Sequence, residues 1–314
     1  MGKKRKSNKK GKRKQLSKST KETYAKQNKI IESVAPLTSP KSMTDYDVLK
    51  ISKELNSTEE KKLLKISACL KGERINNRQE IDLWELRLLA LSPEGLLHPE
   101  IRKIVWPTLL GIDIFQNDSS GKSLYTSVPK KEYLTQGERS TIEQDVNRTV
   151  WISEGSSTRF EKILAHAKKE NKVMKFQNFT FKSILDSTIT NALAQCNTKL
   201  YYYQGYHDLA SILLLNLYSP ALTSKILSQI SSFYLFDFMQ QSFLSTVSVL
   251  QIGLWTLLQF MDEELLDYLL DTGLELHSFI LSWIIGWFSH DIKDITIASR
   301  IIDVCIASHP AMPM

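Results

Sequence analysis

Apolar residues recur every three or four positions through most of this chain, and this spacing constrains the fold more than any other feature. Between Asp45 and Leu70 the spacing is interrupted at residues 56–60, where capping residues predict that one helix ends and another begins. The alternation typical of strands is almost absent, so we expect an all-α, multi-helix protein. Further helices are predicted over residues 81–91, 98–110, 139–151, 157–171, 178–196, 205–217, 220–241, 243–261, 262–271, 274–289 and 292–308, with a surface loop over 112–137.

The positive charge of the chain is concentrated at its start. Residues 1–50 hold 15 Lys and Arg against 4 Asp and Glu, whereas the other 264 residues hold 26 against 30. Residues 1–43 lack a periodic apolar pattern, which predicts a disordered, lysine-rich tail. Such a tail can bind an anionic membrane surface, bind RNA, serve as a nuclear import signal or only aid solubility, and the residues do not choose among these. We interpret residues 44–79 as a helical N-terminal extension and 80–314 as the main domain.

Neither a secreted nor a membrane-spanning protein is indicated. No apolar stretch follows the basic start, and no run reaches the 18 apolar residues of a transmembrane helix. The longest apolar run is residues 279–288, which is typical of a buried core helix. The three cysteines are far apart and odd in number, which excludes a disulfide framework and favours reduced, buried thiols in a cytoplasmic protein.

Nucleotide-binding and metal-binding motifs are also missing from the sequence. Residues 121–123 read Gly-Lys-Ser, but a phosphate-binding loop needs a glycine five residues earlier, where Gln116 stands. The six histidines are scattered and form no zinc motif. His207 and Asp208 are adjacent in a predicted helix, which should point them about 100° apart, so we do not expect them to form an acid–base pair. No cofactor or metal is therefore expected in this chain.

Three short segments stand out: residues 95–106 (GLLHPEIRKIVW), 142–149 (IEQDVNRT) and 202–209 (YYQGYHDL). On a helix, Asp145 and Arg148 lie side by side, which alone describes an ordinary exposed ion pair. The third segment places a glutamine among tyrosines, directly before a glycine and an apolar helix, with an aspartate in the first turn where negative charge is favourable. Alone, it describes the tyrosine-rich edge of a core.

In this order, the three segments resemble the TBC domain, the catalytic module of GTPase-activating proteins for Rab-type small GTPases. The family signatures are R-x-x-x-W, I-x-x-D-x-x-R and Y-x-Q-G. They match, in order, Arg102 and Trp106, then Ile142, Asp145 and Arg148, then Tyr202, Gln204 and Gly205. The later aromatic and charged pattern of the family matches Phe279, Trp283, Phe288, Arg300 and Asp303, so that the resemblance covers roughly residues 80–314.

The resemblance implies that catalysis is shared with a Rab-family GTPase in its GTP state, which binds GTP and Mg²⁺ itself. Arg148 would be the arginine finger and Gln204 the glutamine finger. Among the supporting residues, Asp145 would orient Arg148 or its helix, Arg102 and Trp106 would shape the groove or its support, and Tyr202, Gly205 and Asp208 would hold Gln204. The GTPase is then the hydrolase, and this chain its activator. The alternative is a Rab-binding or scaffolding TBC protein without catalysis, against which the presence of both fingers argues.

Two further features resemble one branch of the family, that of TBC domain family member 20 and its fungal counterparts. These are the residues QGYHD at 204–208 and SHPAMP at 308–313. Members of that branch are typically anchored in the endoplasmic reticulum and act in early secretory traffic. The resemblance implies a role in ER-to-Golgi transport, at the cytoplasmic surface of these membranes, with nuclear import through the basic tail as the alternative. Because the chain stops at Met314, we expect the last helices of the domain and the membrane anchor of the branch to be missing.

Overall fold

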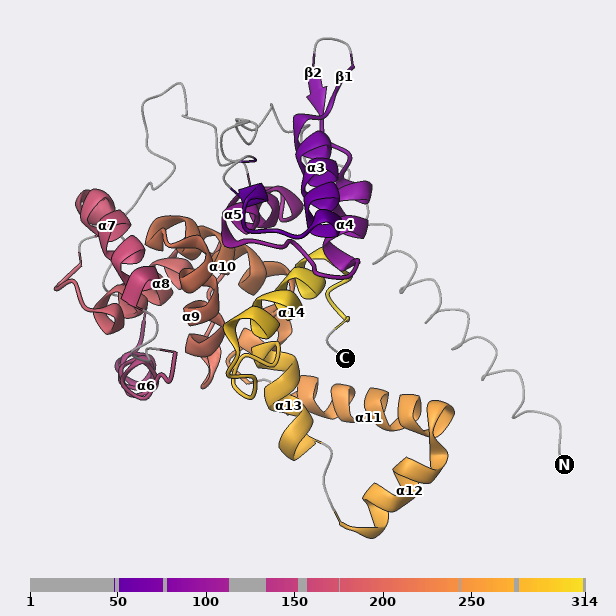
Figure 1. Cartoon of the computed structure of the whole chain (residues 1–314). Coiled ribbons are helices and arrows are strands. Elements are labelled where there is room, and N and C mark those ends of the chain that lie inside the picture. The colour runs from indigo at the N-terminus through magenta and orange to yellow at the C-terminus, as the bar shows by residue number, and fades with distance from the viewer. Residues whose placement is uncertain are drawn as a thin grey trace, which may run out of the picture.

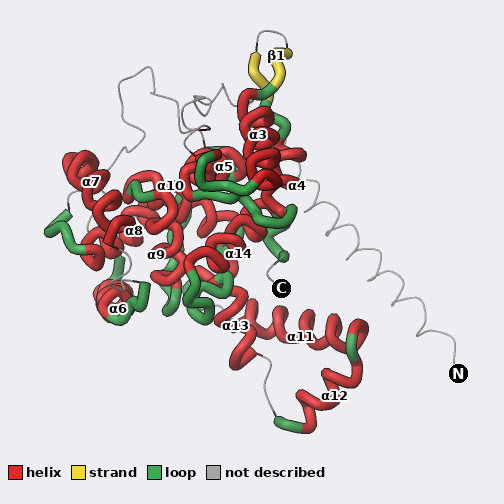
Figure 2. The backbone as a smooth tube through the Cα atoms, viewed as in Figure 1, coloured by secondary structure: helices red, strands yellow, loops and turns green. Residues whose placement is uncertain are grey.

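The computed structural model describes residues 48, 51–75, 78–112, 134–151, 157–174, 176–242, 244–273 and 277–312. Over these residues the all-α prediction is confirmed, with a single short hairpin beside the helices (Figures 1 and 2). The predicted basic tail lies outside the described residues, as do the rejected Gly-Lys-Ser motif and most of the predicted loop over 112–137.

The elements follow one another along the chain with mostly short connections. In order they are α3 (Ser57–Lys71), β1 (Glu73–Ile75), β2 (Arg78–Glu80), α4 (Leu83–Leu91), α5 (Pro99–Leu109), α6 (Gln136–Asn147), α7 (Ser157–Met174), α8 (Phe181–Ala194), α9 (Tyr206–Leu217), α10 (Pro220–Phe233), the 3₁₀ helix η2 (Phe236–Met239), α11 (Leu244–Met261), α12 (Glu263–Asp271), α13 (His277–Gly286) and α14 (Ile295–Ala307).

The hairpin differs from the sequence prediction, which placed these residues in a helical extension. β1 and β2 pair antiparallel, with Glu73 opposite Glu80 and Ile75 opposite Arg78. α3 ends at Lys71, and the N–H of the following Gly72 caps the helix by donating to the carbonyls of Ala68 and Cys69. α3 itself packs against α4, and its buried face belongs to the main hydrophobic core. The extension is thus part of the same packed unit.

The helix predicted over residues 220–241 is also different, because it is broken in two. α10 ends at Phe233, and Leu235 turns inward and is buried before η2 begins. Met239, at the end of η2, is fully buried, and its carbonyl accepts a hydrogen bond of 2.8 Å from the N–H of Tyr201. The break therefore brings η2 against the segment that leads to Gln204.

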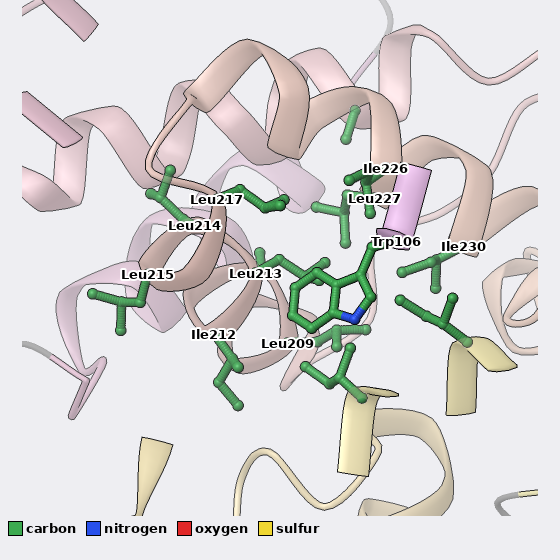
Figure 3. Packing of buried hydrophobic residues seen from close by; sticks show 14 of the residues in the cluster. Trp106, Leu209, Ile212, Leu213, Leu214, Leu215, Leu217, Ile226, Leu227 and Ile230 are labelled. Carbon is green, nitrogen blue, oxygen red and sulfur yellow. The ribbon is translucent and has the colours of Figure 1, made fainter. Parts of the chain in front are cut away.

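Helix α9 is the centre of the fold. Every residue from Tyr206 to Leu217 is buried, as expected for a helix that is apolar on nearly all sides. It contacts α5, α6, α7, α8, α10, α13 and α14. Figure 3 shows the indole of Trp106, from α5, among the leucines of α9 and Ile230 of α10. The start of α9 is thereby held in the core, and Gln204 lies two positions before its first residue.

A buried ion pair joins α5 to α14. The guanidinium of Arg102 donates two hydrogen bonds to the Asp303 carboxylate, from Nε at 3.0 Å and from Nη2 at 2.9 Å. The indole Nε1 of Trp106 and the N–H of Leu96 donate to the same carboxylate at 2.9 and 3.0 Å. Only glycine fits at position 95, because its φ is +55° and a Cβ there would lie 2.5 Å from Asp303 Oδ2. Asp303 therefore fixes three segments at once.

Helices α11 and α12 extend away from the other helices (Figure 1). A small separate cluster joins α11 to α13, in which Leu250 and Leu254 pack with Ile284. Many other apolar side chains of α11 and α12 are exposed: Val249, Ile252, Leu257, Phe260, Met261, Leu265, Tyr268 and Leu270. Among the helices of the described residues, none combines the length and apolar character needed to span a bilayer.

We predict that Arg102→Ala lowers the free energy of unfolding by about 3–5 kcal/mol, because it leaves the Asp303 carboxylate buried without a cation. Urea denaturation at neutral pH measures this loss. The matched control is Glu100→Gln on the same helix, which removes a partly exposed pair with Lys103 and should cost less than about 1 kcal/mol. Equal losses in the two variants would contradict the structural role given to the buried pair.

Candidate functional site

Arg148 lies at the carboxyl end of α6, where a cation is favourable for the helix. The helix begins with a capping box, in which Thr135 and Glu138 satisfy each other's backbone N–H groups, and Arg148 is its C-cap. The Nη2 atom of Arg148 is 2.5 Å from Oδ1 of Asp145. The arginine side chain is 52% exposed and the aspartate side chain only 2%. The pair is therefore unlike the exposed ion pair that the spacing alone describes.

Gln204 is exposed at the tip of the segment that leads into α9, next to two buried tyrosines. The hydroxyl of Tyr203 donates to the Ile285 carbonyl at 2.6 Å, and the rings of Tyr202 and Tyr203 both meet Tyr206 edge to face. Gly205 follows with φ +97°, a conformation that a residue with a Cβ adopts only under strain. The glutamine thus projects from a rigid base.

One carboxylate joins these two segments. Oδ2 of Asp145 accepts hydrogen bonds from the Tyr202 hydroxyl at 2.7 Å and from the Gly205 N–H at 3.1 Å, while Oδ1 contacts Arg148. Tyr202 lies two positions before Gln204 and Gly205 directly after it, so the two donors hold the glutamine from both sides. Asp145 thereby links the end of α6 to the Gln204 segment.

The ionised state of Asp145 is maintained by its neighbours. Burial alone would raise the pKa of this carboxyl, but the contacts with His207, Tyr202 and the Gly205 N–H outweigh burial and hold the pKa below its usual value. Burial and the adjacent carboxylate raise the pKa of Tyr202 well above its usual value, so its hydroxyl stays a donor.

A second link joins the same two segments at the other end of α6. Glu138 accepts hydrogen bonds from Lys199 Nζ at 3.1 Å and from the Tyr202 N–H at 3.4 Å, in addition to its capping role. Burial would raise the pKa of Glu138, but the Thr135 and Lys199 contacts outweigh it and lower the pKa. α6 is thus attached to the Gln204 segment at both of its ends.

Most of the predicted site residues are brought together here. Tyr202 and Gly205 bond Asp145, and Asp208 lies in the first turn of α9, as the sequence predicts. Arg102 and Trp106 instead contact Asp303 in the buried cluster that joins α5 to α14.

The sequence did not predict the contacts of two histidines. His207 and Asp208 face each other, contrary to the expected 100° separation, with 3.4 Å between Nε2 and Oδ1. His207 Nδ1 also lies 3.5 Å from Asp145 Oδ2. His290, which follows α13, makes a hydrogen bond of 2.8 Å to Asp208. The side chains of adjacent helical residues can still turn toward each other about their own bonds, which a helical wheel does not represent. Among the described residues, no group of His, Cys, Asp and Glu is arranged to hold a metal ion.

Comparison with known proteins agrees with the motifs. The model of the Rab-GTPase-TBC domain family matches residues 99–313. TBC1 domain family member 20 of Bos taurus is 30% identical over 264 residues, which cover 83% of this chain and 57% of that protein. GTPase-activating protein gyp10 of Schizosaccharomyces pombe is 29% identical over 231 residues, 73% of this chain and 54% of that protein.

This chain therefore belongs to the Rab-GTPase-TBC domain family. Within that family it is similar to the member 20 proteins and to gyp10, which confirms the resemblance seen in the motifs. The chain spans little more than half the length of these relatives, 57% and 54%. A solved structure, the Ypt/Rab-GAP domain of Gyp1p, is only weakly similar, with a TM-score of 0.49 and 14% identity over 80% of each chain.

We predict that acidification removes the stabilisation that Asp145 provides. Because its folded pKa lies below the unfolded value, this contribution is complete above the unfolded pKa and is lost as the pH falls through the folded pKa. The difference in unfolding free energy between the wild type and Asp145→Asn should therefore shrink as the pH falls below about 5, through the unfolded pKa of about 3.9 and on toward the lower folded pKa. Urea denaturation at several pH values measures it, and a difference independent of pH would contradict the prediction.

Proposed function

We propose that this chain is a GTPase-activating protein, which accelerates GTP hydrolysis by a Rab-type small GTPase by supplying Arg148 and Gln204 in trans. The observation that carries the proposal is that both residues are exposed, that Arg148 contacts the buried Asp145 carboxylate, and that Tyr202 and Gly205, on either side of Gln204, donate to the same carboxylate. Two side chains held in this way can enter one active site of a partner together, with little loss of conformational entropy.

Arg148 has the chemistry of an arginine finger. Its guanidinium would neutralise the charge that develops on the transferred phosphoryl group and on the leaving oxygen, an effect of about 10³–10⁵ in rate. The side chain is half exposed, and its pairing with Asp145 limits its rotamers without covering it. A phosphate in the partner's site would replace the carboxylate as the group that the guanidinium binds.

Gln204 has the chemistry needed to position water. Its amide offers both a donor and an acceptor, so it can orient the attacking water in place of the GTPase's own glutamine. The GTPase would bind GTP and Mg²⁺ in its own site, and no cofactor of this chain takes part. The buried tyrosines and Gly205 would keep the amide in place during the reaction.

The cellular setting is a further part of the proposal. The branch resemblance of residues 204–208 and 308–313 supports a role in vesicle transport between the endoplasmic reticulum and the Golgi, at the cytoplasmic membrane surface. The lysine-rich residues 3–29 would strengthen contact with an anionic membrane.

Single-turnover GTP hydrolysis by a panel of Rab GTPases tests this function. We predict that the chain accelerates one or a few of them, that Arg148→Ala reduces the acceleration by about 10³-fold or more, and that Arg148→Lys does not restore it, because lysine lacks the planar fork. Gln204→Ala should reduce the acceleration by about 10²-fold. The Gln204 side chain is exposed, so Gln204→Ala should change the unfolding free energy little, whereas Arg148→Ala also removes a cation from the buried Asp145 carboxylate and should lower it.

The matched controls are Arg139→Ala on the same helix and Gln195→Ala on an exposed surface, which should leave the rates unchanged. A GTP-loaded Rab that binds the chain but hydrolyses GTP no faster would assign the chain to the non-catalytic alternative. Acceleration that survives loss of either finger would contradict the proposed mechanism.

A further inference from the structure

A buried histidine lies between two buried carboxylates at the start of α9. The side chain of His207 is 3% exposed, with Nδ1 at 3.5 Å from Asp145 Oδ2 and Nε2 at 3.4 Å from Asp208 Oδ1. Both distances are slightly longer than a hydrogen bond, and Nδ1 has no hydrogen-bond partner. Each ring nitrogen therefore faces a carboxylate oxygen across a gap that a small movement would close, so that an N–H at Nδ1 can donate to Asp145 and one at Nε2 to Asp208.

The contacts continue to the surface. Asp208 Oδ2 bonds Nδ1 of His290, whose side chain is 62% exposed. Asp145, His207, Asp208 and His290 thus form a chain of polar groups from α6, through the first turn of α9, to the turn after α13. At its inner end, this row of contacts includes the Asp145 carboxylate, which contacts Arg148 and accepts a hydrogen bond from the Gly205 N–H.

Arg148 and His207 hold Asp145 from different sides. Arg148 is the exposed cation on Oδ1, and in the proposed function it extends toward a phosphate. Once it has left, Asp145 keeps the Tyr202 hydroxyl, the Gly205 N–H and His207. A buried carboxylate that has lost a cation tends to move or to take up a proton, and movement would release, whereas protonation would weaken, the hydrogen bond from the Gly205 N–H beside Gln204.

We propose that His207 is a positioning residue, whose imidazole holds the Asp145 carboxylate against Tyr202 and Gly205 so that Gln204 stays aligned when Arg148 extends. The effect of His207 on catalysis rests on the proposed function. The effect of His207 on the structure of the Gln204 segment is independent of that function and can be measured on this protein alone.

Three substitutions separate the two sides of the ring. In His207→Asn the amide nitrogen is close to the position of Nδ1 and can donate to Asp145. In His207→Gln it is close to Nε2 and serves Asp208 instead. His207→Leu has similar bulk and serves neither carboxylate. We therefore expect His207→Asn to keep the contact with Asp145, and His207→Gln and His207→Leu to lose it.

Amide hydrogen exchange of Gly205, measured by NMR on the isolated full chain, tests the structural part. We expect exchange at Gly205 to be faster by about 10-fold or more in His207→Leu and His207→Gln, and to stay near the wild-type rate in His207→Asn. Exchange in the middle of α9 is the control for folding. If Leu does not fold, the Gln and Asn variants decide the outcome. Equal exchange at Gly205 in the wild type, Gln and Asn would overturn the proposal.

Single-turnover kinetics with a responsive Rab tests the catalytic part. A misaligned finger lowers the maximal rate, so His207→Gln and His207→Leu should lose about 10- to 100-fold in that rate with an unchanged half-saturating concentration. His207→Asn should stay within about threefold of the wild type. A change confined to the half-saturating concentration, or an equal fall of the maximal rate in His207→Asn and His207→Gln, would overturn the catalytic part of the proposal. If no Rab responds to the wild type, the proposed function fails, while the exchange experiment still decides the role of His207.

Discussion

The carboxylate of Asp145 is the interaction on which the candidate site depends. It is buried, so its charge is tolerated only because donors surround it, and these donors come from separate parts of the chain. Arg148 belongs to the end of α6, whereas Tyr202 and Gly205 belong to the segment before α9. Satisfying one charge therefore requires that these segments take one relative position, and this position places two exposed polar side chains near one another.

Asp303 provides a similar constraint between α5 and α14. Arg102, Trp106 and the N–H of Leu96 all donate to it, so α5 and the turn before it are fixed to α14. The apolar contacts around α9 are not directional, and many arrangements would bury the same side chains. The hydrogen bonds to the two buried aspartates are directional and therefore select one arrangement of the helices, provided that every donor is in place.

The helices were predictable from the sequence because burial of one face imposes a spacing of three to four residues, and Arg148, Gln204 and Gly205 were recognisable because the motifs preserve their order. Other features depend on contacts between distant segments. The spacing of Asp145 and Arg148 fits an exposed pair equally well, and contacts from the distant residues Tyr202 and Gly205 accompany the burial of the aspartate. Likewise, α10 ends early because Leu235 and Met239 find a buried position near Tyr201. The contact between His207 of α9 and Asp145 of α6 joins two helices that are far apart in the sequence, and no local pattern encodes it.

A double-mutant cycle between Asp145 and Gln204 tests most directly whether one carboxylate positions the fingers. The maximal single-turnover rate would be measured with a responsive Rab for the wild type, Asp145→Asn, Gln204→Ala and the double variant. If Asp145 holds Gln204 in place, Gln204→Ala should cost about 10²-fold in the wild type but only a few-fold once Asp145 is replaced. An equal cost in both backgrounds would show that Gln204 is positioned without Asp145, and would contradict the account.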